Sequence, residues 1–150
     1  MYKRILVAIE HSAADATIVD HVRQLARLAG ARLLLVHVAD GWVARNYDEL
    51  QLRDSEEMRE DRAYLEQLTA ELASSGLATE WRLGMGDPAS ELLRIAGEEH
   101  ADLIAMATHG HRGLGDLVHG TTVNRVRHQT TIPVLLLRAP VRHERTGHET

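Results

Sequence analysis

The chain of 150 residues contains no cysteine, which excludes disulfide bonds, thiol catalysis and metal sites built on cysteine sulfur. It has no apolar run close to the roughly 18 residues of a membrane span, and its charged first residues do not resemble a secretory signal. A formal net charge of −5 argues against general nucleic-acid binding, which usually requires a basic face. These absences predict a cytosolic protein with no nucleic-acid or membrane partner.

Several catalytic and binding motifs are also missing. The chain has no G-x4-GK[ST] loop of the P-loop nucleotide hydrolases and no SGG-x-D-S loop of adenylating synthetases. Ser12 lacks the G-x-S-x-G context of a nucleophile, so it is interpreted as a helix cap. His109, His111 and His119 lie near one another in sequence, but no carboxylate at helical spacing completes a metal site. No catalytic residue and no metal ligand is predicted.

Five short runs of apolar or alternating residues predict five strands, at 3–9, 32–38, 77–83, 102–107 and 133–137. Between them lie segments with apolar residues at helical spacing. Ser12 with Asp15 predicts the start of the first helix, Gly30 its end, and Asp87-Pro88 the start of the third helix. The segment 40–52 is expected to be a surface loop.

Strands that alternate with helices predict an α/β fold with a five-stranded, mainly parallel open sheet and helices on both faces. Ligands of such sheets bind beyond the carboxyl ends of the strands, where the strand order reverses. Glu10, Val38 and Ala107 are expected to share one crevice if the first and fourth strands are neighbours.

A glycine-rich segment follows the fourth strand, with Gly110, Gly113, Gly115 and Gly120. Thr121 and Thr122 come next, at the predicted start of a helix. A glycine loop that leads from a strand into a helix places free N–H groups and the positive helix end around an anion. The arrangement therefore favours a phosphate site.

These features together resemble the universal stress protein family over almost the whole chain. The resemblance rests on the opening ILVAIEHS, on LLLVHV, on GDPASELLRIAGEEHADLIAMATHG, on QTTIPVLLLR and on the glycine motif. Nucleotide-binding members carry Gly-x2-Gly-x9-Gly-Ser/Thr, and this chain has Ala107-x2-Gly110-x9-Gly120-Thr121. The resemblance implies a Rossmann-like sheet of the adenine nucleotide α-hydrolase type with strand order 3-2-1-4-5.

The resemblance further implies a site for ATP, AMP or ADP, with Mg²⁺ as a companion of the phosphates, and at most slow ATP hydrolysis. The residues that it assigns to the nucleotide are the main chain of Val38 and Met106 for adenine, Glu10 for the ribose with Ala8 beneath it, and Ala107, Gly110, Gly120, Thr121 and Thr122 for the phosphates.

Two of these positions depart from the family pattern: Ala107 replaces the first glycine, and Glu10 replaces the usual aspartate. If position 107 needed a positive φ, alanine would cost roughly 1–2 kcal/mol. A stress-response sensor or regulator that binds adenine nucleotide is the first hypothesis. The alternative is a dimeric interaction or protective module of the same family that binds no nucleotide.

The apolar last strand would be an aggregation hazard if it formed a bare sheet edge. Family members commonly pair this strand across a two-fold axis. A homodimer through Pro133 to Arg138 is therefore expected. The domain is expected to span 1–138, followed by a flexible tail at 139–150.

Overall fold

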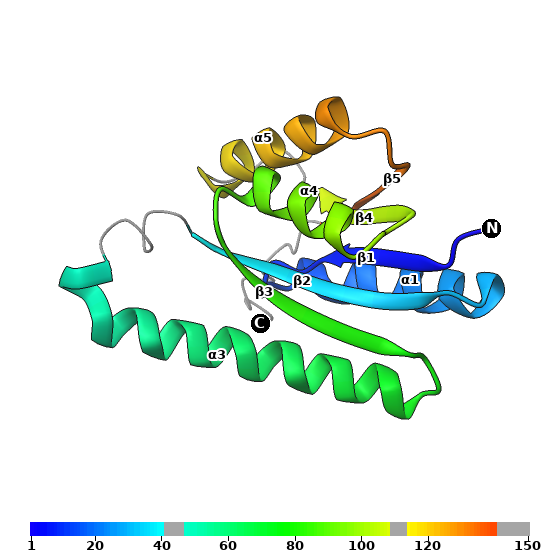
Figure 1. Ribbon diagram of the computed structural model, residues 1–150, viewed down its shortest axis with the longest axis horizontal. Coiled ribbons are helices and arrows are strands. Elements are labelled where there is room, and N and C mark those ends of the chain that lie inside the picture. The colour runs from blue at the N-terminus through cyan, green and yellow to red at the C-terminus, as the bar shows by residue number, and fades with distance from the viewer. Residues whose placement is uncertain (41–46, 109–113, 141–150) are drawn as a thin grey trace, which may run out of the picture.

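The computed structural model describes residues 1–40, 47–108 and 114–140, and within them it does not describe the side chains of 40, 47–55 and 114–120. The described part of the chain forms a three-layer α/β structure with one central sheet (Figure 1). Within that part, no helix is both long enough and apolar enough to cross a lipid bilayer.

The sheet has five strands in the order β3-β2-β1-β4-β5, and every neighbouring pair is parallel. The strands are β1 (Arg4–Ala8), β2 (Arg32–Asp40), β3 (Thr79–Gly86), β4 (Leu103–Thr108) and β5 (Val134–Arg138). The expected fold class and strand order are confirmed. So is the adjacency of the first and fourth strands, which pair from Ile5 opposite Leu103 to Val7 opposite Ala105.

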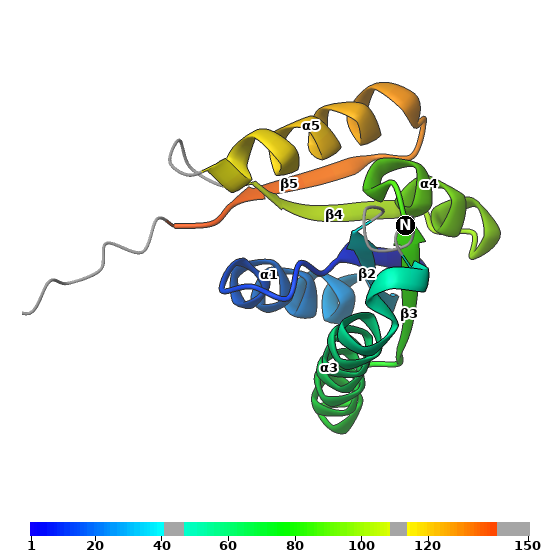
Figure 2. The same ribbon diagram turned by 90° about the vertical axis from the view of Figure 1, so that its left-hand side faces the viewer.

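Four helices cover the two faces of the sheet. They are α1 (Ala14–Ala29), α3 (Tyr47–Ser74), α4 (Pro88–Glu98) and α5 (Leu114–Gln129). Figure 2 shows α1 and α3 on one side of the sheet and α4 with α5 on the other.

Two helix boundaries follow the local signals in the sequence. The helix α1 ends at Gly30, which adopts the left-handed conformation at φ 67° and donates its N–H to the carbonyl of Ala26. The helix α4 begins after Asp87, whose side chain accepts the N–H of Ser90, and Pro88 fills the first helical position.

Three boundary predictions were wrong. Ala13 rather than Ser12 occupies the cap position of α1, without a side-chain cap. The expected loop at 40–52 was wrong at both ends, because β2 extends to Asp40 and α3 begins at Tyr47; residues 41–46 lie outside the described residues. The helix α5 begins at Leu114, well before Thr121, because a glycine inside a helix costs only about 0.5–1 kcal/mol and does not stop it.

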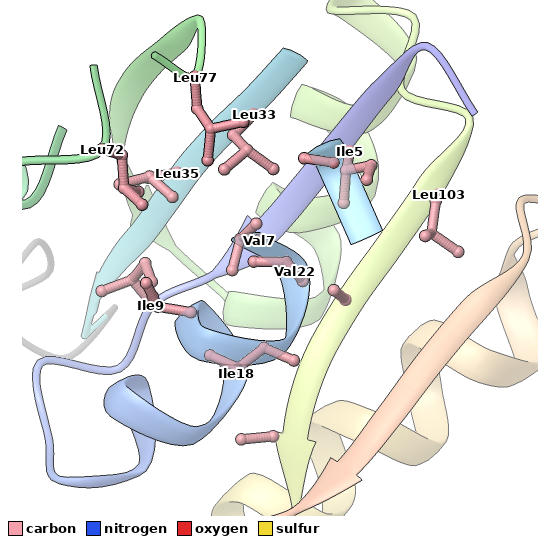
Figure 3. Packing of buried hydrophobic residues seen from close by; sticks show 14 of the residues in the cluster. Ile5, Val7, Ile9, Ile18, Val22, Leu33, Leu35, Leu72, Leu77 and Leu103 are labelled. Carbon is pink, nitrogen blue, oxygen red and sulfur yellow. The ribbon is translucent and has the colours of Figure 1, made fainter. Parts of the chain in front are cut away.

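Alternate residues of each strand pack into two separate cores. Ile5, Val7, Leu33 and Leu35 face α1 and α3, with Leu72 and Leu77 beside them (Figure 3). The residues between them in sequence face α4 and α5; these include Leu6, Ala8, Leu34, Val36, Ile104 and Met106. A sheet buried on both faces requires such continuous apolar strands.

Candidate functional site

A pocket of about 110 Å³ lies at the carboxyl ends of β1, β2 and β4. The strand order reverses between β1 and β4, so this is the position where open α/β sheets hold ligands. The described residues that line it are Ala8, Ile9, Glu10, Val36, His37, Val38, Pro88, Leu92, Met106, Thr122 and Val123. Five of the nine predicted site residues are among them: Ala8, Glu10, Val38, Met106 and Thr122.

The main chain of Val38 faces this pocket because β2 extends further than its neighbour β1. The carbonyl of Val36 accepts the N–H of Ile9 at 2.8 Å, and the ladder with β1 ends there. Main-chain groups of alternate residues in a parallel strand point to the same side. The N–H and C=O of Val38 therefore point over the end of β1.

The same reasoning applied to β4 changes the predicted role of Met106. The N–H of Ile104 donates to the carbonyl of Pro133, so Ile104 and Met106 direct their main-chain groups toward β5. Met106 contributes its side chain to the pocket lining. Ala107 directs its N–H and C=O toward the side of β1, beyond the last residue of the β1–β4 ladder.

Ala107 needs no unusual backbone conformation. It lies inside β4 and is 4% exposed, with its side chain packed among the residues that face α1 and α3. Among the described non-glycine residues, only His11 and His100 have a positive φ. The methyl group in place of the first motif glycine therefore causes no backbone strain here.

Glu10 lies in the turn between β1 and α1, which is held by a buried carboxylate. Asp15 is 3% exposed and accepts the N–H of Glu10 at 2.8 Å and the N–H of Ser12 at 3.1 Å. The Ser12 hydroxyl donates to Oε2 of Glu10 at 3.1 Å and accepts the N–H of Ala14. Through these bonds, Ser12 stabilises the turn that precedes α1.

The predicted phosphate residues lie in or before α5. Thr121 and Thr122 are inside this helix, where main-chain N–H groups bond to the carbonyls four residues earlier. Thr122 lines the pocket, and Thr121 is exposed. Gly120 also belongs to α5, whereas Gly110 lies outside the described residues, as do His109 and His111.

A pair of ionic hydrogen bonds joins α4 to α5 beside the pocket. Nη1 of Arg125 lies 2.7 and 2.8 Å from the two carboxylate oxygens of Asp87. The bond to Arg125, together with the bonds from Ser90, holds the pKa of Asp87 well below its usual range. Asp87 therefore remains charged at neutral pH and ties the two helices that form one wall.

Several residues at the pocket were not found from the sequence. Val36, Pro88, Leu92 and Val123 follow the ordinary apolar pattern of buried strands and helices, so nothing distinguished them. His37, inside β2, also lines the pocket, and its Nδ1 lies 2.7 Å from the Ile9 carbonyl oxygen. In the described part of the chain, no group of three or more His, Cys, Asp or Glu side chains is arranged to hold a metal ion.

Comparisons of sequence and of structure with known proteins point to one family. A model of the universal stress protein family matches residues 1–138. A universal stress protein of Thermus aquaticus is 35% identical, over 92% of this chain and 100% of its own length. The solved structure of a universal stress protein from Methanocaldococcus jannaschii superposes with a TM-score of 0.78 at 25% identity, covering 94% of this chain and 99% of that one.

Two more distant structures with the same fold carry nucleotides. One is a universal stress protein in complex with cAMP, at 21% identity and a TM-score of 0.65, covering 91% of this chain and 97% of that one. The other is the Archaeoglobus fulgidus protein in complex with dAMP, at 21% identity and a TM-score of 0.67, covering 90% and 97%. At this level of identity the two show a shared fold.

Proposed function

The chain belongs to the universal stress protein family, and we propose that it binds an adenine nucleotide in the pocket at the ends of β1, β2 and β4. The observation that carries the proposal is the main chain of Val38, a lining residue whose N–H and C=O point over the end of β1. Ala107, near the end of β4, directs its main-chain groups toward the side of β1 but is not among the lining residues. Adenine presents donors and acceptors on a flat edge, which such groups can recognise.

The walls of the pocket suit a flat apolar ring. Ala8, Val36, Leu92 and Met106 provide hydrophobic surface on the face covered by α4 and α5. Glu10 is the acid at the end of β1, and a carboxylate accepts hydrogen bonds from ribose hydroxyl groups. Relatives of this fold in complex with cAMP and dAMP support the same class of ligand.

The pocket is smaller than the roughly 300–1,000 Å³ of sites that enclose a drug-sized ligand. It therefore suits the base and part of the ribose. Gly110, Gly120, Thr121 and Thr122 are the proposed phosphate residues, with the threonine hydroxyls as donors. Since the described residues contain no group of three or more His, Cys, Asp or Glu side chains that could hold a metal ion, Mg²⁺ would be held chiefly by the phosphates themselves.

The role that follows is that of a nucleotide-dependent regulator of a stress response. Among the described residues that line the pocket there is no histidine–carboxylate–nucleophile arrangement, and the Ser12 hydroxyl is engaged in its own turn. We expect hydrolysis to be slow. The alternative, a protective module that binds no nucleotide, predicts no response to ATP.

The test is isothermal titration calorimetry with ATP, with and without Mg²⁺, supported by thermal shift. Heat of binding and a higher melting temperature are expected at millimolar ATP, because a ligand that binds only the folded state stabilises it by RT ln(1 + [L]/Kd). Gly120→Val should weaken binding by crowding the phosphate region. Gly97→Val, in α4, is the matched control, since a Cβ added at Gly97 meets no atom within 4 Å. Absence of heat and shift with the unmodified protein would refute the proposal.

We further propose a homodimer through β5. This strand lies at the edge of the sheet, and Val134, Leu135, Leu136 and Leu137 are only half-buried. An apolar edge strand invites pairing with another chain. A monomeric mass by light scattering at micromolar concentration would contradict the proposal.

A further inference from the structure

The turn that carries Glu10 has an unusual backbone. His11 adopts φ 61°, a left-handed conformation that crowds the Cβ of an L-residue against the following carbonyl. Such a conformation persists only when surrounding contacts hold it, and it is often found beside binding sites. The contacts that hold His11 come from α3, on the opposite face of the sheet from α4 and α5.

Two residues of α3, one helical turn apart, hold the His11 side chain. Nδ1 of His11 lies 2.7 Å from Oδ1 of Asp61. The imidazole ring stacks on the ring of Tyr64, with centroids 4.1 Å apart and planes at 19°. The strained turn is thus anchored to the middle of a long helix.

Tyr64 also holds the carboxylate that fixes Glu10. Its hydroxyl donates to Oδ2 of Asp15 at 2.7 Å, while Oδ1 of Asp15 accepts the main-chain N–H of Glu10 at 2.8 Å. Burial, and then the bond and charge of Asp15, raise the pKa of Tyr64 far above its usual value, so the hydroxyl remains a donor. A path of two hydrogen bonds therefore leads from α3 to the Glu10 main chain.

His37 connects the pocket lining to the same point on α3. Its Nδ1 donates to the Ile9 carbonyl at 2.7 Å, since a carbonyl oxygen only accepts. Its Nε2 lies 3.4 Å from Oδ2 of Asp61. That contact is attractive only when Nε2 also carries a proton, because a neutral ring would present a lone pair to the carboxylate.

We infer that Asp61 and Tyr64 are positioning residues for the nucleotide pocket, which they reach through His11, Asp15 and His37. The inference rests on the proposed function. It adds a link, made of these hydrogen bonds and ionic contacts, between α3 and the part of the pocket lining formed by Ile9 and Glu10. Loss of the link releases Glu10 from the position from which it would contact the ribose. Conversely, a ligand that moves Glu10 shifts the contacts of α3.

The experiment measures ATP affinity by calorimetry for the unmodified chain, Tyr64→Phe, Asp61→Asn and Glu66→Gln. Glu66 is an exposed acid of the same helix, so its variant matches the charge change of Asp61→Asn. Tyr64→Phe keeps the ring and loses one hydrogen bond, which corresponds to an affinity loss of roughly threefold to tenfold. Asp61→Asn removes the carboxylate that His11 and His37 contact and should also weaken binding. Glu66→Gln should leave affinity unchanged.

The outcomes separate the two proposals. If the unmodified chain binds no ATP, the proposed function fails and the inference with it. If it binds while Tyr64→Phe and Asp61→Asn bind equally well, the inference alone fails. If Glu66→Gln weakens binding as much as Asp61→Asn does, the loss of charge alone explains the effect and the inference is overturned. A shift of the Glu10 amide resonance in nucleotide-free Tyr64→Phe is expected, and its absence would also count against the inference.

Discussion

The two ends of the sheet are built on different principles. From the amino ends of β1, β2 and β3, arginine and glutamate side chains alternate in one connected series that continues along α4: Arg32, Glu80, Arg4, Glu99, Arg82, Glu98, Arg94 and Glu91. At the carboxyl ends, the strands border an apolar pocket with one acid, Glu10, in its lining.

The contrast between the ion-pair series and the pocket indicates that stability and binding depend on different ends of the sheet. Arg4 Nη2 lies 2.9 Å from Glu80 and 2.7 Å from Glu99, and each member of the series has an oppositely charged neighbour. Each exposed pair is worth only about 0–1 kcal/mol, although a connected series adds rigidity. The carboxyl end of β2 instead directs the main-chain groups of Val38 over the end of β1, at the pocket. A change at one end should therefore affect stability and a change at the other should affect binding.

The largest effect should come from filling the pocket end. Ala8→Leu adds three carbons to a residue that lines the pocket and should reduce ATP affinity at least 30-fold, about 2 kcal/mol. The melting temperature should stay within a few degrees, since the new side chain enters existing space. Calorimetry and thermal melts measure the two effects. A normal affinity would place the nucleotide elsewhere.

A smaller effect, of the opposite kind, is expected at the amino end. The carboxylate of Asp102 accepts the N–H groups of Lys3 at 2.8 Å and Arg4 at 3.0 Å. Asp102→Ala removes both acceptors and should lower the free energy of unfolding by about 1–3 kcal/mol, as measured by urea denaturation. ATP affinity should change less than twofold. Asp102→Asn keeps one acceptor oxygen and should recover part of the loss.

The smallest effect concerns the ionic bond between Asp87 and Arg125. Because the folded-state pKa of Asp87 lies below its unfolded value, the stabilisation is present at neutral pH and is lost as the pH falls below about 4. The pair is partly exposed, so we expect about 1 kcal/mol or less. Asp87→Asn keeps the helix cap and should flatten the decline of melting temperature between pH 5 and 2. An unchanged slope would show that the pair contributes nothing.

Much of the fold could be predicted because its signals are local. The strand β4 is an apolar run from Leu103 to Ala107, and the pair Asp87-Pro88 predicts the start of a helix from two residues alone. The start of α5 was missed because glycine weakens a helix without forbidding it, so Gly115 and Gly120 were interpreted as loop.

The candidate site was predictable only in part. Glu10, Val38 and Ala107 follow from the rule that ligands lie beyond the strand ends. Met106 was expected to offer its main chain to the ligand, but its main-chain groups face β5, whereas those of Ala107 face the side of β1. Which neighbour each residue faces is set by the register with β5. Apolar lining residues such as Leu92 carry no sign that distinguishes a pocket wall from a core.

The order of the elements, the parallel sheet and the end of that sheet at which a ligand would bind can all be predicted from the amino-acid pattern. Hydrophobic periodicity and helix caps act over a few residues, so they can be found without coordinates. Three-dimensional packing was needed to show that Ala107 has no positive φ, and that Asp61 and Tyr64 reach His11 and Asp15 across about 50 positions of sequence. Such contacts depend on how β1, α1, β2 and α3 pack together, and no local pattern specifies that packing.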